Sequence, residues 1–175
     1  VPIACDDPAR VRSACLAYGA DGSRLARYDK VHLFRFAHGD EAYDETRTIE
    51  RGAEVVALDA PFGRIGLTIC YDLRFPELYR ALGDCALVCV PSAFTWTTGS
   101  AHWHLLLRAR AVENQTWVLA AAQGGVHENG RRTYGHSMLV DPWGEVAAER
   151  SEDGPGFVAG LCDPARTEEV RARLP

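Results

Sequence analysis

One stretch of the sequence, residues 65–77, constrains the fold of this chain more than any other. It reads IGLTICYDLRFPE, and its apolar side chains alternate with Gly66, Thr68 and Cys70. A period of two predicts a strand with one packed face. Pro76 followed by Glu77 predicts the first turn of a helix, because proline and an acidic residue both suit a helix start. We therefore expect Cys70 at the carboxyl end of a buried strand, in a turn that opens a helix.

Cys70 is the candidate nucleophile. A helix with its amino end towards the sulfur would favour the thiolate over the thiol. Attack of a thiolate on a carbonyl carbon produces an oxyanion, and in strand–turn–helix geometry the N–H of Tyr71 points towards that oxyanion. An isolated cysteine in an apolar strand is, however, usually a small buried hydrophobic residue. The local pattern leaves both interpretations open.

The rest of the chain alternates strands and helices. Hairpins are predicted at residues 12–31 and 55–70, and Lys30 lies at the end of the first hairpin. Residues 32–52 and 124–135 are polar and irregular, which predicts loops. Further strands are expected at 85–90, 117–122, 136–140, 145–149 and 157–161, and helices at 76–82, at 100–114 behind an N-cap at Ser100, and at 164–173 behind an N-cap at Asp163. This order predicts an α/β protein with a mixed sheet system and helices packed outside it.

Composition and charge argue against several kinds of partner. A net charge of −5 and a pI near 5.7 do not suit a phosphate-binding surface, so no nucleic-acid partner is expected. The sequence has no apolar run of roughly 18 residues and no basic-then-apolar leader, which predicts neither a membrane span nor a signal peptide. The six cysteines lie mostly in apolar runs of a chain that needs no disulfides to fold, so we expect reduced thiols in a cytoplasmic protein.

Lys30 is the only lysine among 19 basic residues. Its compact ammonium, which changes charge state readily when buried, suits a site where a cysteine exchanges protons with a lysine and a carboxylate. Chance is the alternative explanation for a single lysine. Histidine would be a commoner partner, but the six histidines fit surface or supporting positions better. His102 and His104 flank Trp103 and diverge on a helix, so the two of them cannot bind one metal well.

No spacing of cysteines or histidines fits a structural zinc site, and no glycine pattern fits a phosphate-binding loop. The sequence therefore predicts no metal and no cofactor. Arg74, in the same turn as Cys70, is a candidate for holding a substrate carboxylate through a bidentate pair. A salt bridge from Arg74 to Glu77 or Asp72 that locks the turn is an equally good interpretation.

Two motifs, YDKVHLF at residues 28–34 and ICYDLRFPE at 69–77, resemble those of the nitrilase superfamily of carbon-nitrogen hydrolases. The likeness continues in order through PSAF at 91–94, GSAHW at 99–103, LLRARA at 106–111, AAAQ at 120–123, YGHSM at 134–138 and VDPWG at 140–144. It covers essentially the whole chain. The later motifs are most similar to the deaminated glutathione amidase branch.

The resemblance implies an αββα sandwich with a Cys-Lys-Glu triad and no cofactor. Cys70 matches the nucleophile that forms a thioester, and Lys30 matches the lysine that stabilises the oxyanion together with the Tyr71 N–H. Glu45 matches a second glutamate that orients the lysine. The expected substrate is a small carboxylate-bearing amide, cleaved with water. We expect residues 94–99 and 124–135 to shape the pocket, and the substrate-binding residues to be Tyr71, Arg74, Phe94 and Thr95. Family members assemble through helices packed across a two-fold axis, so a homo-oligomer is expected.

In one respect the sequence departs from the family. The general-base glutamate of the triad belongs to an amino-terminal strand and helix, and residues 1–29 contain no glutamate. Because the chain also begins with Val1 and has its only methionine at Met138, we expect residues 1–175 to be a partial carbon-nitrogen hydrolase domain, without the amino-terminal strand and helix and without the carboxyl-terminal tail. Alternatives are an ω-amidase, an N-carbamoyl amide hydrolase, or a non-catalytic interaction module that lacks the base.

Overall fold

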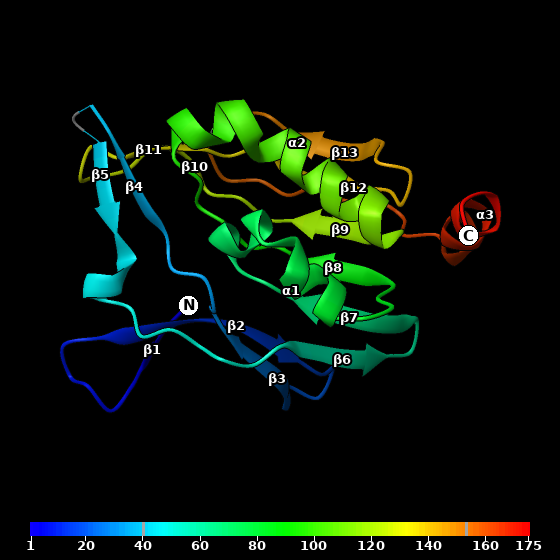
Figure 1. Cartoon of the computed structure of the whole chain (residues 1–175), viewed down its shortest axis with the longest axis horizontal. Helices are drawn as coiled ribbons and strands as arrows, with labels where there is room; N and C mark the ends of the chain where they lie inside the picture. Colours follow the sequence, from blue (N-terminus) through cyan, green and yellow to red (C-terminus); the bar gives the residue numbers. More distant parts are fainter. Residues whose placement is uncertain (40, 153) are drawn as a thin grey trace.

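A six-stranded mixed sheet forms the centre of the molecule (Figure 1). The computed structural model describes residues 1–39, 41–152 and 154–175. The strand order is β13-β12-β9-β8-β7-β6, in which β7, β8 and β9 run parallel and the outer pairs are antiparallel. The bounds are β6 (Val56–Ala60), β7 (Gly63–Leu67), β8 (Leu87–Cys89), β9 (Trp117–Ala120), β12 (Ser137–Val140) and β13 (Val146–Arg150).

Two helices, α1 (Pro76–Ala81) and α2 (Trp96–Asn114), cover one face of this sheet. Side chains alternate along a strand, so one set of apolar residues from β8, β9 and β12 points at the helices. Trp103 and Leu107 of α2 are fully buried against that set, which includes Val118 and Met138. A third helix, α3 (Pro164–Arg173), packs at the opposite end of the parallel strands from Cys70, where the Trp117 ring N–H donates to the Asp163 carbonyl at 3.3 Å.

A second, three-stranded sheet lies beside β6 (Figure 1). It consists of β1 (Pro2–Ala4), β2 (Val11–Tyr18) and β3 (Arg24–Asp29). Its side chains Cys15, Ala17 and Ala26 pack against the main core. This sheet matches the predicted hairpin at residues 12–31, and Lys30 follows directly after β3.

Two of the predicted loops are wrong, because each contains a hairpin. Within residues 32–52 lie β4 (Arg35–His38) and β5 (Glu41–Asp44), followed by the 3-10 turn η1 (Glu45–Arg47). Within residues 124–135 lie β10 (Gly124–Val126) and β11 (Arg132–Tyr134). These short strands lie outside the two larger sheets and carry mixed polar and apolar side chains, so no apolar alternation marks them in the sequence.

Two further predictions need correction. Helix α2 begins at Trp96, and Thr95 rather than Ser100 is its N-cap, with the Thr95 side chain accepting the Thr98 N–H at 3.2 Å. Residues 157–161 form no strand; Phe157 and Leu161 are largely exposed, and the segment finds no pairing partner among the described strands.

Across the described residues, no helix is both long and apolar enough to span a membrane.

Candidate active site

Cys70 lies just beyond the carboxyl end of β7. The strand ends at Leu67, three residues earlier than predicted, and Cys70 opens a 3-10 turn, η2 (Cys70–Arg74). The Cys70 N–H donates to the Pro91 carbonyl at 3.0 Å, and its φ is +51°. A non-glycine residue in this left-handed region is strained, so the surrounding structure has to hold it there. Such strain is typical of a nucleophile presented on a sharp turn.

Asp72 anchors this turn. Its fully buried carboxylate accepts hydrogen bonds from the Tyr28 hydroxyl at 2.7 Å, the Ile69 N–H at 2.8 Å and the His32 N–H at 3.0 Å, and it contacts the His32 ring nitrogen at 2.8 Å. A buried carboxylate is stable only with partners of this kind. Tyr28 and His32 lie two residues before and two residues after Lys30, so the same carboxylate ties the lysine segment to the cysteine turn.

Lys30 is buried, with 2% of its surface exposed, and is paired with Glu45. Its Nζ donates to Glu45 Oε2 at 2.6 Å, and that oxygen also accepts the Phe34 N–H at 2.7 Å. The Lys30 carbonyl accepts the Gly52 N–H at 2.8 Å; a Cβ at Gly52 would collide with the Asp29 carbonyl, so glycine is required for this approach. A buried ammonium with a hydrogen-bonded partner keeps its charge in a defined place.

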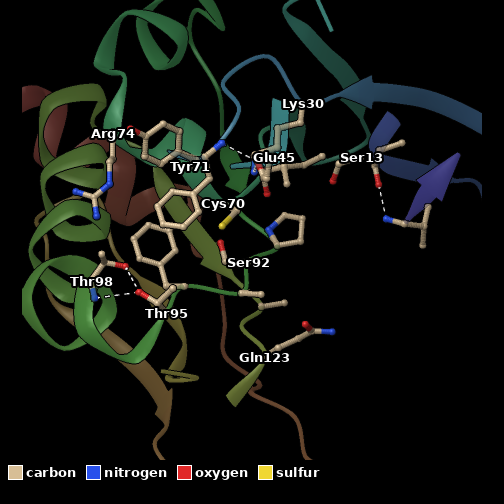
Figure 2. A pocket seen from close by; sticks show the side chains of 18 of the residues that line it. Ser13, Lys30, Glu45, Cys70, Tyr71, Arg74, Ser92, Thr95, Thr98 and Gln123 are labelled. Carbon is tan, nitrogen blue, oxygen red and sulfur yellow. Dashed lines mark hydrogen bonds and ion pairs between the residues drawn. The ribbon is translucent and has the colours of Figure 1, made fainter. Parts of the chain in front are cut away.

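All seven site residues predicted from the sequence line one cavity of about 300 Å³ (Figure 2). Cys70, Lys30 and Glu45 lie on the same side of the cavity, and Figure 2 shows the Cys70 sulfur in this view between Glu45 and Ser92. The predicted substrate-binding residues also line the cavity, namely Tyr71, Arg74, Phe94 and Thr95. The structure therefore brings the cysteine and the lysine to one cavity; the individual roles remain predictions.

The electrostatics of Cys70 combine two opposing influences. Burial raises the pKa of the Cys70 thiol, and the nearby Lys30 ammonium and the Ala93 backbone only partly offset that rise. The thiol in this chain is therefore protonated at neutral pH and needs a proton acceptor to become a nucleophile. The Tyr71 N–H donates to no other residue in the described part of the chain, which leaves it available to an oxyanion.

The substrate-binding candidates differ in their contacts. Arg74 pairs with neither Glu77 nor Asp72; its Nη2 contacts the His102 ring at 3.2 Å, and its guanidinium lies over the Tyr71 and Phe94 rings. The interpretation of Arg74 as a lock for the turn is therefore wrong. Phe94 is mostly buried against Trp103, and the fully buried Thr95 hydroxyl contacts Thr98 at 2.9 Å as part of the helix cap.

Among the cavity residues that sequence reasoning missed are Ser92, Gln123 and Arg131. Ser92 and Gln123 follow β8 and β9, and ligands of α/β sheets bind outside the carboxyl ends of parallel strands, so their position after apolar strands was the available signal. Arg131 comes from the β10–β11 hairpin. Its Nη2 donates to the Ala93 carbonyl at 2.6 Å, whereas its Nε is buried without a partner among the described residues.

Comparisons with known proteins place this arrangement in context. The profile of the family described as carbon-nitrogen hydrolase matches residues 5–172. The deaminated glutathione amidase of Yersinia enterocolitica is 44% identical over 99% of this chain and 62% of its own length, and the human omega-amidase NIT2 is 38% identical over 97% of this chain and 62% of its own length. The crystal structure of the C. elegans NitFhit protein matches with a TM-score of 0.88 at 44% identity, over 98% of this chain and 42% of that chain. The chain thus spans less than two thirds of the length of each of these relatives.

Proposed function

The chain belongs to the carbon-nitrogen hydrolase family, and on that premise we propose that it hydrolyses the amide bond of a small carboxylate-bearing molecule through a thioester on Cys70. The observation that supports the proposal is the shared cavity, which Cys70, the buried Lys30 and Tyr71 all line, with the Tyr71 N–H lacking an acceptor among the described residues. One nucleophile and two donors for the developing oxyanion are what acyl transfer needs.

The proposed reaction has two halves. In the first half, Cys70 Sγ attacks the amide carbon, the oxyanion is stabilised by Lys30 Nζ and the Tyr71 N–H, and the carbon–nitrogen bond breaks. The proton lost by the thiol passes through a general base to the departing nitrogen, which leaves as ammonia. In the second half, water attacks the thioester, its proton returns to the sulfur, and the product leaves as a carboxylic acid. Bonds and protons balance without a cofactor.

Glu45 acts in this scheme as a positioning residue. It is the only carboxylate among the described residues that line the cavity, and its Oε2 is already shared by the Lys30 ammonium and the Phe34 N–H. We therefore assign Glu45 to holding Lys30, as the family resemblance implies. That resemblance gives the general base to a further glutamate, so the activity tests use the complete gene product.

The charge of the cavity supports an anionic substrate. Besides Lys30, which Glu45 neutralises, two guanidinium groups line the cavity, those of Arg74 and Arg131. Arginine binds carboxylates through paired hydrogen bonds. A deaminated glutathione-type amide, the substrate in the name of the Yersinia relative, is the specific form of this proposal. An ω-amidase substrate or an N-carbamoyl amide is the alternative within the family, and the human relative is an omega-amidase.

Assembly and location are also proposals. The exposed side of α2 carries Leu105 and Val112, which are 66% and 46% exposed and could pack against a second copy. A net charge of −5 supports a protein without a nucleic-acid partner. We propose a cytoplasmic homo-oligomer on these grounds and on the family resemblance.

The decisive experiment is to trap the thioester. The complete gene product is mixed with each of a panel of amides (deaminated glutathione, an α-keto-ω-amide and an N-carbamoyl amino acid), quenched in acid and digested for mass spectrometry. We expect ammonia release and an acyl adduct on the peptide that carries Cys70, with both lost in Cys70→Ser and both kept in Cys162→Ser. An adduct-free protein that releases no ammonia from any of the amides would instead support the non-catalytic interaction module.

A further inference from the structure

A cluster of three metal-binding side chains lies outside the cavity, on the side of α2 that meets β13. His104 comes from α2, His136 directly precedes β12, and Glu149 lies on β13. Glu149 Oε1 is 2.8 Å from His104 Nε2 and 2.6 Å from His136 Nδ1, and the three ligand atoms lie within 4.8 Å of one another. None of the three lines the cavity around Cys70.

The surrounding structure holds the His136 ring in one orientation. The residue has a φ of +58°, its carbonyl accepts the Trp103 ring N–H at 2.8 Å, and its imidazole stacks on Tyr134 with ring centroids 4.1 Å apart and planes inclined by 19°. The His104 ring meets the same tyrosine edge-on at 6.0 Å. Trp103 and His104 are neighbours on α2, so both imidazoles are fixed relative to the same turn of helix. Prepositioned ligands lower the cost of ordering a metal site.

The cluster also has the charge and access that a cation needs. Glu149 supplies the carboxylate, and its Oε1 already faces a ring nitrogen of both imidazoles. The three side chains are between 20% and 36% exposed, which gives a hydrated ion a path to them.

We propose that His104, His136 and Glu149 bind one divalent first-row transition cation, zinc being the best match. Two imidazole nitrogens and one carboxylate oxygen are ligands that zinc takes, and three protein ligands leave a position for water. Metal binding needs the lone pairs of His104 Nε2 and His136 Nδ1, the two ring nitrogens that face Glu149, so in the bound state the ring protons lie on His104 Nδ1 and His136 Nε2. The bound ion replaces two hydrogen bonds with three metal–ligand bonds and fastens α2 to β12 and β13.

This proposal revises the expectation that the chain holds no metal. His102 and His104 diverge on the helix, as the sequence indicates, but His104 finds its partners elsewhere. Glu149 is 45 residues from His104 and 13 residues from His136 along the chain, so no short sequence motif predicts the site.

The test is a Co²⁺ titration of the complete protein followed by visible absorption, because cobalt takes the place of zinc and gives a spectrum. We expect one high-affinity ion per chain with nitrogen and oxygen ligands. Glu149→Gln and His104→Gln should each weaken binding by at least about tenfold, since even a residue that only supports a metal ligand is worth that much. His38→Gln removes an exposed histidine outside the cluster and should leave the affinity unchanged.

Zinc should also raise the melting temperature of the wild-type protein, by about 5 °C or more at a concentration about a hundredfold above its Kd, and a chelator should reverse the change. Glu149→Gln should fold normally without metal and lose this response. Three results would overturn the proposal: equal cobalt affinity in Glu149→Gln and wild type, a spectrum dominated by thiolate bands from the free cysteines, or no saturable binding. The last result would leave the cluster as a hydrogen-bonded fastening of α2.

Discussion

The Asp72 network that holds the Cys70 turn and the two arginines that line the cavity, Arg74 and Arg131, are built in contrasting ways. In the turn, the buried Asp72 carboxylate uses both oxygens on Tyr28, Ile69 and His32, and every partner is fixed by its own backbone or by packing. The arginines have fewer hydrogen bonds: Arg131 has one carbonyl partner and a buried Nε without one among the described residues, and Arg74, at the end of the turn, has one histidine contact besides the Tyr71 and Phe94 rings.

The contrast teaches which part of the site performs the reaction and which part selects the substrate. A satisfied buried network is rigid, which suits groups that must meet a reacting carbon within a fraction of an ångström. Donors without internal partners are costly unless a ligand supplies the missing acceptors. The reacting groups and the selecting groups should therefore be separable by mutation, and the following predictions test that separation.

The largest effect is expected from Lys30→Met. The change removes an oxyanion donor and leaves the Glu45 carboxylate without its cation, so kcat/KM should fall by about a thousandfold or more. The rate of ammonia release from the amide that forms the thioester adduct measures kcat/KM. Arg27→Met is the matched control, because Arg27 lies on β3, the strand that leads into Lys30, and pairs with Asp29 outside the cavity. Activity within tenfold of wild type in folded Lys30→Met would contradict the assignment.

Next in size is Asp72→Asn. An amide at this position turns one acceptor into a donor that faces the N–H groups of Ile69 or His32, so the free energy of unfolding should fall by roughly 3 kcal/mol. Urea unfolding measures the change. Asp59→Asn, at an exposed position on β6, is the control and should be nearly neutral. A change below about 1 kcal/mol at Asp72 would show that the turn does not depend on this carboxylate.

A smaller and more selective effect is expected from Arg131→Gln. The KM for an amide with a distant carboxylate should rise by about tenfold with kcat nearly unchanged, because a charge-assisted hydrogen bond made equally in the ground and transition states affects binding alone. A neutral amide should be affected much less. Arg132→Gln is the control: its guanidinium stacks on Trp96 and does not line the cavity. Equal losses for neutral and anionic amides would argue against a carboxylate contact.

The smallest effect concerns pH. Because burial raises the pKa of the Cys70 thiol above the ordinary 9.0, alkylation of Cys70 by iodoacetamide should still accelerate at pH 9 in this chain. Lys30→Met removes the nearby ammonium that favours the thiolate, so the whole profile should move to higher pH. Rates at Cys70 are followed by peptide mass spectrometry. A rate that reaches its plateau below pH 8 would mean that the cavity stabilises the thiolate more than burial opposes it.

The sequence predicted the centre of this site because local patterns determine it. The alternation before Cys70 and the Pro76-Glu77 helix start are short-range signals, and the α/β carbon-nitrogen hydrolase fold inferred from the motifs is confirmed by the family match. Lys30 follows a strand of a predictable hairpin and lines the same cavity as Cys70, whereas the catalytic roles of both residues stay predictions.

Other features depended on contacts that no local pattern contains. Ser100 and Thr95 are both acceptable N-caps, and the structure uses Thr95, so residues 96–99 are helical. The helix backbone at Gly99 packs so closely on Tyr134 that a Cβ there would collide with its ring. That contact joins residues far apart in the sequence. The polar strands β4 and β5 gain stability from pairing with each other. Arg131 lines the cavity from the β10–β11 hairpin, and its hydrogen bond to the Ala93 carbonyl joins residues 38 apart in the sequence.

The left-handed backbone of Cys70 has an evolutionary consequence. A chain under selection for folding stability alone would place glycine at position 70, because glycine adopts a φ of +51° without strain. A cysteine at this position costs backbone strain, and only selection for reactivity maintains it. A lineage released from that selection should drift towards glycine or asparagine at this one position while keeping Asp72 and the rest of the turn. Such descendants would have a higher free energy of unfolding and no hydrolase activity.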